Sequence, residues 1–94
     1  MGYLLVHNKV KDYNTWKPVF DEHASMREAA GSKGGYVLQN LDDPSEVTII
    51  LEWDDMDKAR EFAQSQDLRE AMEKAGVIGP PDIRFLERVD RPSV

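Results

Sequence analysis

Residues 12–31 carry a single stripe of mostly apolar side chains at helical spacing. The members of this stripe recur at steps of three and four positions and are Trp16, Val19, Phe20, His23, Met26, Arg27 and Ala30. This spacing predicts an amphipathic α-helix, which has to cover an apolar surface elsewhere in the chain. Asp12 is well suited to cap the start of this helix, and Gly31 is well suited to end it in the left-handed conformation.

Three residues disturb this pattern. Pro18 falls in the second turn, so we expect the helix to kink or to begin there. His23 and Arg27 lie on the otherwise apolar stripe, where polar groups need partners. Both residues are therefore candidates for chemistry.

The remaining chain alternates between strand and helix patterns. The predicted elements are strand 3–10, loop 32–35, strand 36–41, turn 42–46, strand 47–53, a helix capped by Asp54 or Asp55, a short helix from Ser65 to Gly76, the stiff extended segment 79–81 and strand 83–89. Two strand–helix–strand halves joined by a hairpin predict a ferredoxin-like α+β sandwich with a four-stranded antiparallel sheet. The first and third strands are the most apolar and are expected in the middle of the sheet. The 94 residues suit one domain, 1–94.

Composition narrows the classes of partner. The net charge of −6 argues against nucleic acid, which requires a basic surface. No apolar run approaches the roughly 20 residues of a membrane span. Residues 3–10 lack the basic start of a signal peptide, so we expect a cytoplasmic protein.

Both faces of the predicted strands carry apolar side chains. The helices cover one face of such a sheet, and a sheet with one wet face alternates more cleanly than this one. We therefore expect the open sheet face to pack on the same face of a second copy, which forms an isologous homodimer. A solvent-exposed apolar face is the alternative interpretation.

Four segments resemble the dimeric α+β barrel superfamily. They are VHNKVKDYNTWKPVFDEH (6–23), DDPSE (42–46), LEWDDMDKAREF (51–62) and GPPDIRFL (79–86). The nearest likeness is to small stand-alone members grouped with the antibiotic biosynthesis monooxygenases. The superfamily includes cofactor-free quinol or anthrone monooxygenases, haem-degrading enzymes and polyketide cyclases, so the resemblance implies the fold more sharply than the activity.

The resemblance also implies a site. In active members the substrate lies within one protomer, between helices and sheet. Transferred to this chain, such a cavity would be lined by Asn8, Trp16, Phe20, His23, Arg27, Trp53, Phe62 and Met72. Asn8 matches an asparagine of the haem-degrading members, and Trp53 matches a tryptophan of some members. Residues 55–75 lack the histidine that the haem-degrading members carry there, which argues against that reaction.

Each candidate residue has a chemical and a structural interpretation. His23 is either a general base or a half-buried histidine that bonds a backbone carbonyl. Arg27 either stabilises an enolate or carboxylate, or pairs with Glu22, Glu28 or solvent. Asn8 either holds an oxyanion or makes a structural hydrogen bond. The aromatic residues either sandwich a flat substrate or form ordinary core.

These patterns suggest a function without a bound cofactor. The chain has no phosphate-binding glycine loop or flavin motif, and its two histidines, His7 and His23, are expected on different faces, which disfavours a metal site. We therefore predict a cofactor-independent monooxygenase for a quinol- or anthrone-like compound, with His23, Asn8 and Arg27 as catalytic residues. A polyketide cyclase that uses the same base is an alternative, as is a non-catalytic small-molecule-binding or stress-associated dimer.

Overall fold

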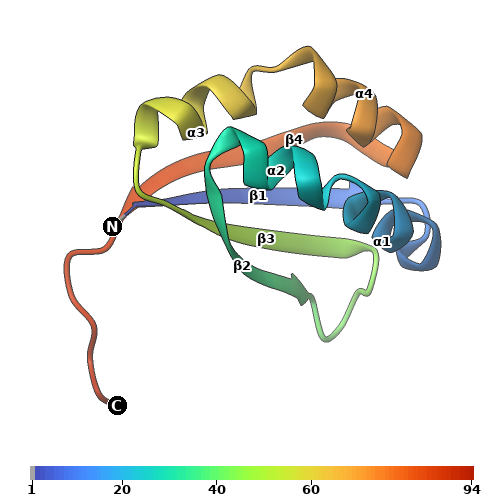
Figure 1. Ribbon diagram of the computed structural model, residues 1–94. Coiled ribbons are helices and arrows are strands. Elements are labelled where there is room, and N and C mark those ends of the chain that lie inside the picture. The colour runs from blue at the N-terminus through green and yellow to red at the C-terminus, as the bar shows by residue number, and fades with distance from the viewer. Residues whose placement is uncertain (1) are drawn as a thin grey trace.

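The computed structural model describes residues 2–94 and contains two strand–helix–helix–strand halves (Figure 1). The elements in chain order are β1 (Gly2–Val10), α1 (Tyr13–Glu22), α2 (Ala24–Ala30), β2 (Ser32–Gln39), β3 (Glu46–Trp53), α3 (Met56–Ala63), α4 (Gln66–Ala75) and β4 (Val77–Glu87). The strands form one antiparallel sheet in the order β2-β3-β1-β4. All four helices cover the same face of the sheet (Figure 1). The predicted ferredoxin-like architecture, with the first and third strands central, is confirmed.

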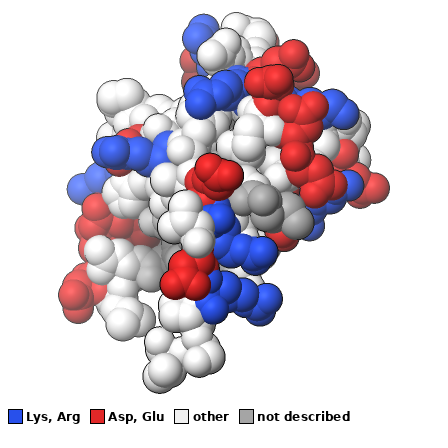
Figure 2. Space-filling view, turned by 90° about the vertical axis from the view of Figure 1, so that its left-hand side faces the viewer, with Lys and Arg blue, Asp and Glu red and all other residues white. Residues whose placement is uncertain are grey.

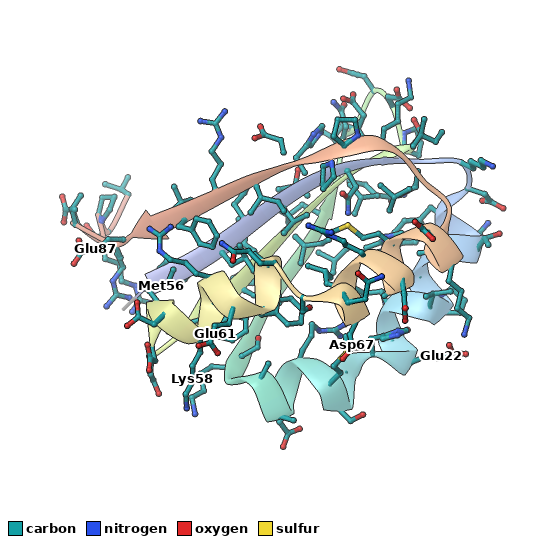
Figure 3. All side chains as sticks on the ribbon, turned by 90° about the horizontal axis from the view of Figure 1, so that it is seen from above. Glu22, Met56, Lys58, Glu61, Asp67 and Glu87 are labelled. Atoms are coloured by element: carbon teal, nitrogen blue, oxygen red, sulfur yellow. The ribbon has the colours of Figure 1, made fainter. Side chains whose placement is uncertain are left out.

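The core lies between the sheet and the helical layer. Alternate residues of β1 and β3 point into it and are buried: Leu4, Val6, Asn8, Val10, Val47, Ile49, Leu51 and Trp53. Trp16 and Val19 of α1 and Phe62 of α3 cover them. Seen onto the helical layer, α1 and α2 run alongside α4 and α3, and these helices are in contact (Figure 3).

The first helical segment breaks at a different place from the one predicted. The Asp12 side chain accepts a hydrogen bond from Asn14 N–H at 3.0 Å, and Gly31 is left-handed with φ of 118°, as expected. The helix continues through Pro18, however, and α1 ends at His23. Pro18 is tolerated because the bond that it removes would reach only the exposed first turn at Asn14. The helix therefore does not start at Pro18, and the break lies further along the chain, at His23.

The second helical segment follows the sequence prediction closely. Of the two candidate caps of α3, Asp55 is the one used, and its side chain accepts from Asp57 N–H at 2.9 Å. The Ser65 hydroxyl accepts from Leu68 N–H at 3.2 Å and so caps α4. The left-handed Gly76 ends α4.

Both edge strands differ from their predicted bounds. Residues 32–35, expected as a loop, begin β2, with a register shift between Ser32 and Gly35. A Cβ at Gly35 would lie 1.8 Å from the Ile50 carbonyl oxygen, so only glycine fits there. Strand β4 begins at Val77 and includes 79–81, because an edge strand tolerates proline. A register shift between β1 and β4 falls at Asn8.

The outer face of the sheet carries large apolar side chains. Tyr36, Leu38 and Leu86 are 70%, 48% and 42% exposed. On the side of the molecule drawn in Figure 2, acidic and basic side chains lie interspersed among uncharged ones. Within residues 2–94, no helix combines the length and the apolar character that crossing a membrane requires.

Candidate functional site

A narrow cavity lies between the helical layer and the sheet. Its volume is about 60 Å³, which holds a few water molecules, and its walls are almost entirely apolar. Seven of the eight predicted site residues line it: Asn8, Trp16, Phe20, His23, Arg27, Phe62 and Met72. These seven are among the fifteen residues that line the cavity.

Trp53 is the predicted residue that does not line the cavity. Its side chain is fully buried, and its ring lies 5.5 Å from that of Phe62, which separates it from the cavity. Its Nε1 is buried without a hydrogen-bond partner among the described residues. In this structure Trp53 belongs to the core under α3.

His23 occupies the break between α1 and α2. Its backbone N–H bonds the Phe20 carbonyl at 3.3 Å, three residues back, so it does not take the helical bond to Val19. The imidazole Nδ1 lies 2.8 Å from the Val19 carbonyl oxygen instead. Because a carbonyl can only accept, Nδ1 carries the hydrogen, and Nε2 of the neutral ring keeps its lone pair. The structural interpretation of His23 thus holds, and it leaves the ring with one nitrogen able to act as a base.

Arg27 also binds a backbone carbonyl at the break between α1 and α2. Its Nη1 donates to the Phe20 carbonyl oxygen at 2.7 Å, and its guanidinium carbon lies 3.6 Å from the centre of the Phe20 ring. No ion pair within residues 2–94 includes Arg27, so the expected pairing with Glu22 or Glu28 is not found. Burial lowers the pKa of the Arg27 guanidinium, and the charge of Asp21 opposes this shift.

The aromatic residues of α1 stack on one another. Trp16 and Phe20 have ring centres 4.9 Å apart with an interplanar angle of 21°, and Tyr13 lies 5.8 Å from Trp16. Arg27 extends this stack from Phe20. Of these three rings, Trp16 and Phe20 line the cavity, and they stack side by side and do not face each other across it.

Asn8 is a buried residue whose side-chain amide lacks a hydrogen bond at its oxygen. Its side chain is 2% exposed, and Oδ1 has no hydrogen-bond partner among the described residues. The structural hydrogen bond expected for Asn8 is therefore missing at this atom. A buried unpaired polar group costs about 1–3 kcal/mol, so this amide is suited to meet a polar group of a ligand.

The sequence did not reveal the role of two backbone carbonyls. Val19 and Phe20 present their oxygens to His23 and Arg27 because the helix breaks at a residue that is neither proline nor glycine. The periodicity did place Met26, Leu68 and Ala71 on inward faces, and all three line the cavity. Within residues 2–94 no group of three or more His, Cys, Asp or Glu side chains is arranged to hold a metal ion.

Similar solved structures support this fold. A protein of Bordetella bronchiseptica named as a candidate antibiotic biosynthesis monooxygenase is 17% identical, with 94% of this chain and 96% of that chain covered and a TM-score of 0.78. SnoaB, a cofactor-independent oxygenase from Streptomyces nogalater, is 13% identical, with coverage of 99% and 97% and a TM-score of 0.78. Rv0793 from Mycobacterium tuberculosis is 11% identical, with coverage of 99% and 100% and a TM-score of 0.68.

Sequence comparison is more specific about the family. No curated protein sequence matches the chain significantly. The family model described as antibiotic biosynthesis monooxygenase matches residues 13–74, which is more than half of the chain and runs from the start of α1 into the last turn of α4. This chain therefore belongs to the antibiotic biosynthesis monooxygenase family.

Proposed function

We propose that this protein is a cofactor-independent monooxygenase that oxidises a small aromatic, polyketide-like compound of the quinol or anthrone type. Family membership supports the reaction class. The observation that carries the proposal is the hydrogen bond from His23 Nδ1 to the Val19 carbonyl. This bond uses Nδ1, so Nε2 keeps its lone pair and is available as a base. His23 lines a cavity that is also lined by Asn8, whose Oδ1 is unpaired.

In this mechanism His23 removes a proton from the substrate. Nε2 takes the proton from a phenol or from the acidic CH₂ of an anthrone. Turning the Asn8 side chain about its terminal bond presents its NH₂ group to the oxyanion that develops. Arg27 adds a positive charge at the same cavity, and the surrounding apolar wall strengthens both interactions.

The substrate anion itself then reduces oxygen. An anthrone anion transfers electrons to O₂, a carbon–oxygen bond forms, and protonation gives a hydroperoxide. Loss of water leaves a quinone, so one oxygen atom enters the product and the other leaves as water. The substrate supplies all four electrons, two when the hydroperoxide forms and two when water is lost, and the protein supplies the base and stabilises the anion.

A tricyclic substrate needs more room than about 60 Å³. Met26 and Met72 are half-buried and line the cavity, and methionine side chains adapt readily to new shapes. The narrow volume also favours a second candidate, a non-catalytic protein that binds a smaller ligand.

Oxygen consumption and quinone formation separate these candidates. We would assay wild type, His23→Ala and His7→Ala against a panel of anthrones and quinols. The monooxygenase proposal expects turnover in wild type and in His7→Ala, whose histidine lies on the outer sheet face, and its loss in His23→Ala. An inactive wild type favours the binding protein, and equal rates in all three contradict the role of His23.

We also propose a homodimer through the outer sheet face. Support comes from the apolar side chains exposed there, including Tyr36 and Leu38 beside the half-buried Ile50. Analytical ultracentrifugation should give a dimer for wild type and a monomer for Ile50→Lys. A monomeric wild type at micromolar concentration contradicts this assembly.

A further inference from the structure

Arg27 lies between two hollows. It lines the inner cavity, and it also lines an outer groove between α2 and the start of β2, together with Ala24, Glu28, Ser32, Lys33 and Gly34. Among the described residues that line either hollow, Arg27 alone lines both. Arg27 therefore lies where the cavity and the outer groove adjoin.

The hydrogen bonding of Arg27 leaves much of its capacity unused. A guanidinium has five N–H donors, and one of them is used, by the Phe20 carbonyl. The group is half-buried, and no carboxylate within residues 2–94 forms an ion pair with it. A charge that is partly withdrawn from water and held in no ion pair is suited to receive an anion.

The Phe20 carbonyl can lose Arg27 without becoming unpaired. The same oxygen accepts the backbone N–H of His23 at 3.3 Å. Rotation of the guanidinium away from Phe20 therefore removes one of two hydrogen bonds, and the helix break keeps the other. The rotation gives up this bond and the contact with the Phe20 ring, and a bound anion would offset that loss.

We propose that Arg27 is both the gate of the cavity and its specificity residue, which admits ligands through the outer groove and selects apolar molecules that carry one anionic oxygen group. This inference rests on the proposed function, since it assigns the substrate class of the same site. The rings of the ligand enter the cavity, and its carboxylate, sulfonate or phenolate binds the guanidinium. The groove charges then affect the approach: Lys33 attracts the anion and Glu28 repels it. Lys33 is available for this role because its link to Asp54, at 3.6 Å, is exposed and weak.

Two fluorescent probes with almost the same rings test the selection. 1-Anilinonaphthalene-8-sulfonate carries a sulfonate, and N-phenyl-1-naphthylamine lacks it. We expect Arg27→Gln to weaken binding of the sulfonate about 10-fold or more, as loss of a charge-assisted hydrogen bond does, and to leave the neutral probe within about 2-fold. Arg27→Lys, which keeps the charge, should retain most of the affinity.

Two further variants locate the probes. Ala71→Trp fills the cavity and should abolish binding of both probes. Arg60→Gln is the matched control, because this arginine also covers a phenylalanine ring, with 4.4 Å from its guanidinium carbon to the centre of Phe85, and lies outside both hollows. Sulfonate binding that survives Arg27→Gln, equal loss of both probes in that variant, or binding that ignores Ala71→Trp would overturn the proposal. Circular dichroism of each variant verifies that it is folded.

Stopped-flow kinetics test the route. Lys33→Gln should slow association of the sulfonate and Glu28→Gln should speed it, both more at low ionic strength, with dissociation unchanged. If neither variant changes the association rate, the proposal that ligands enter through the outer groove is wrong. These measurements need no turnover. The probes can therefore show an anion site at Arg27 even if wild type takes up no oxygen. Conversely, wild type can take up oxygen even if Arg27→Gln binds the two probes as wild type does.

Discussion

The two halves of the molecule have the same plan and end their first helices differently. Between α3 and α4 the break is made by Ser65, whose hydroxyl donates to the Phe62 carbonyl at 2.8 Å and accepts from Leu68 N–H. Between α1 and α2 the corresponding work falls to two large titratable side chains, His23 and Arg27. A serine would complete the first break at lower desolvation cost.

This difference teaches where chemistry enters a repeated architecture. Ser65 uses its hydroxyl fully within the backbone and offers nothing to the cavity. His23 and Arg27 each satisfy one carbonyl and keep further polar atoms beside the cavity. The first break therefore leaves polar atoms beside the cavity, as the proposed function requires, whereas the second is structural alone.

The largest expected effect separates these two roles of His23. Asn places its NH₂ group near the position of Nδ1, so it can still donate an N–H to the Val19 carbonyl, but it cannot act as a base. His23→Asn should therefore remain folded and lose about 10²- to 10⁴-fold of the oxygenase rate, the usual contribution of a general base. The measurement is oxygen uptake with an accepted substrate, and a rate near wild type would remove the distinction between the breaks.

Replacement of Asn8 by leucine should raise the stability of the protein and lower its activity. Asn8→Leu removes a buried amide with an unpaired oxygen and replaces it with an apolar group of similar size. We expect the free energy of unfolding to rise by about 1–3 kcal/mol, while the oxygenase rate falls. Urea denaturation measures the first quantity. Exposed Asn14→Leu is the control and should change stability by less than about 0.5 kcal/mol, and a loss of stability in Asn8→Leu would contradict the unpaired state of the amide.

The two arginines that cover phenylalanine rings sharpen the comparison further. Arg27→Met removes a charge-assisted hydrogen bond to Phe20 and should cost about 1–2 kcal/mol, discounted for partial exposure. Arg60→Met removes only a contact with the Phe85 ring, worth about 0.5–1 kcal/mol at an exposed site. Thermal or urea unfolding of the two variants should rank them in this order. The reverse order would show that Arg27 does not support the first break.

Ser65→Ala gives the smallest expected effect. Loss of this cap should cost about 1 kcal/mol of stability and leave the oxygenase rate unchanged, because Ser65 does not line the cavity. A rate that falls with the cap would mean that the second break also contributes to the site.

Periodicity predicted most of the fold because it reports directly on burial. The alternation in 3–10 and 47–53 identified the two central strands, and Asp12, Asp55, Ser65, Gly31 and Gly76 marked helix ends through their own backbone and side-chain preferences. The edge strands were harder. Gly35 and Pro80 usually indicate loops, and only pairing with a neighbouring strand makes them part of β2 and β4.

The members of the site were more predictable than their contacts. The stripe on residues 12–31 placed His23 and Arg27 inward, and the register of β1 did the same for Asn8. Their hydrogen bonds depend on a helix break at His23 that no local breaker residue announces. Trp53 lies on the same sheet face as Asn8, but at the opposite end of the sheet, beyond the reach of the cavity, and one-dimensional alternation cannot measure that separation.

The hydrogen on the His23 ring tests the central claim most directly. Long-range ¹H–¹⁵N correlation spectra of the neutral imidazole distinguish the two tautomers, and His7→Gln leaves a single histidine to assign. We predict that Nδ1 is protonated, because it donates to the Val19 carbonyl, and that Nε2 carries the lone pair. A ring protonated at Nε2 would contradict this account of the helix break and of the base.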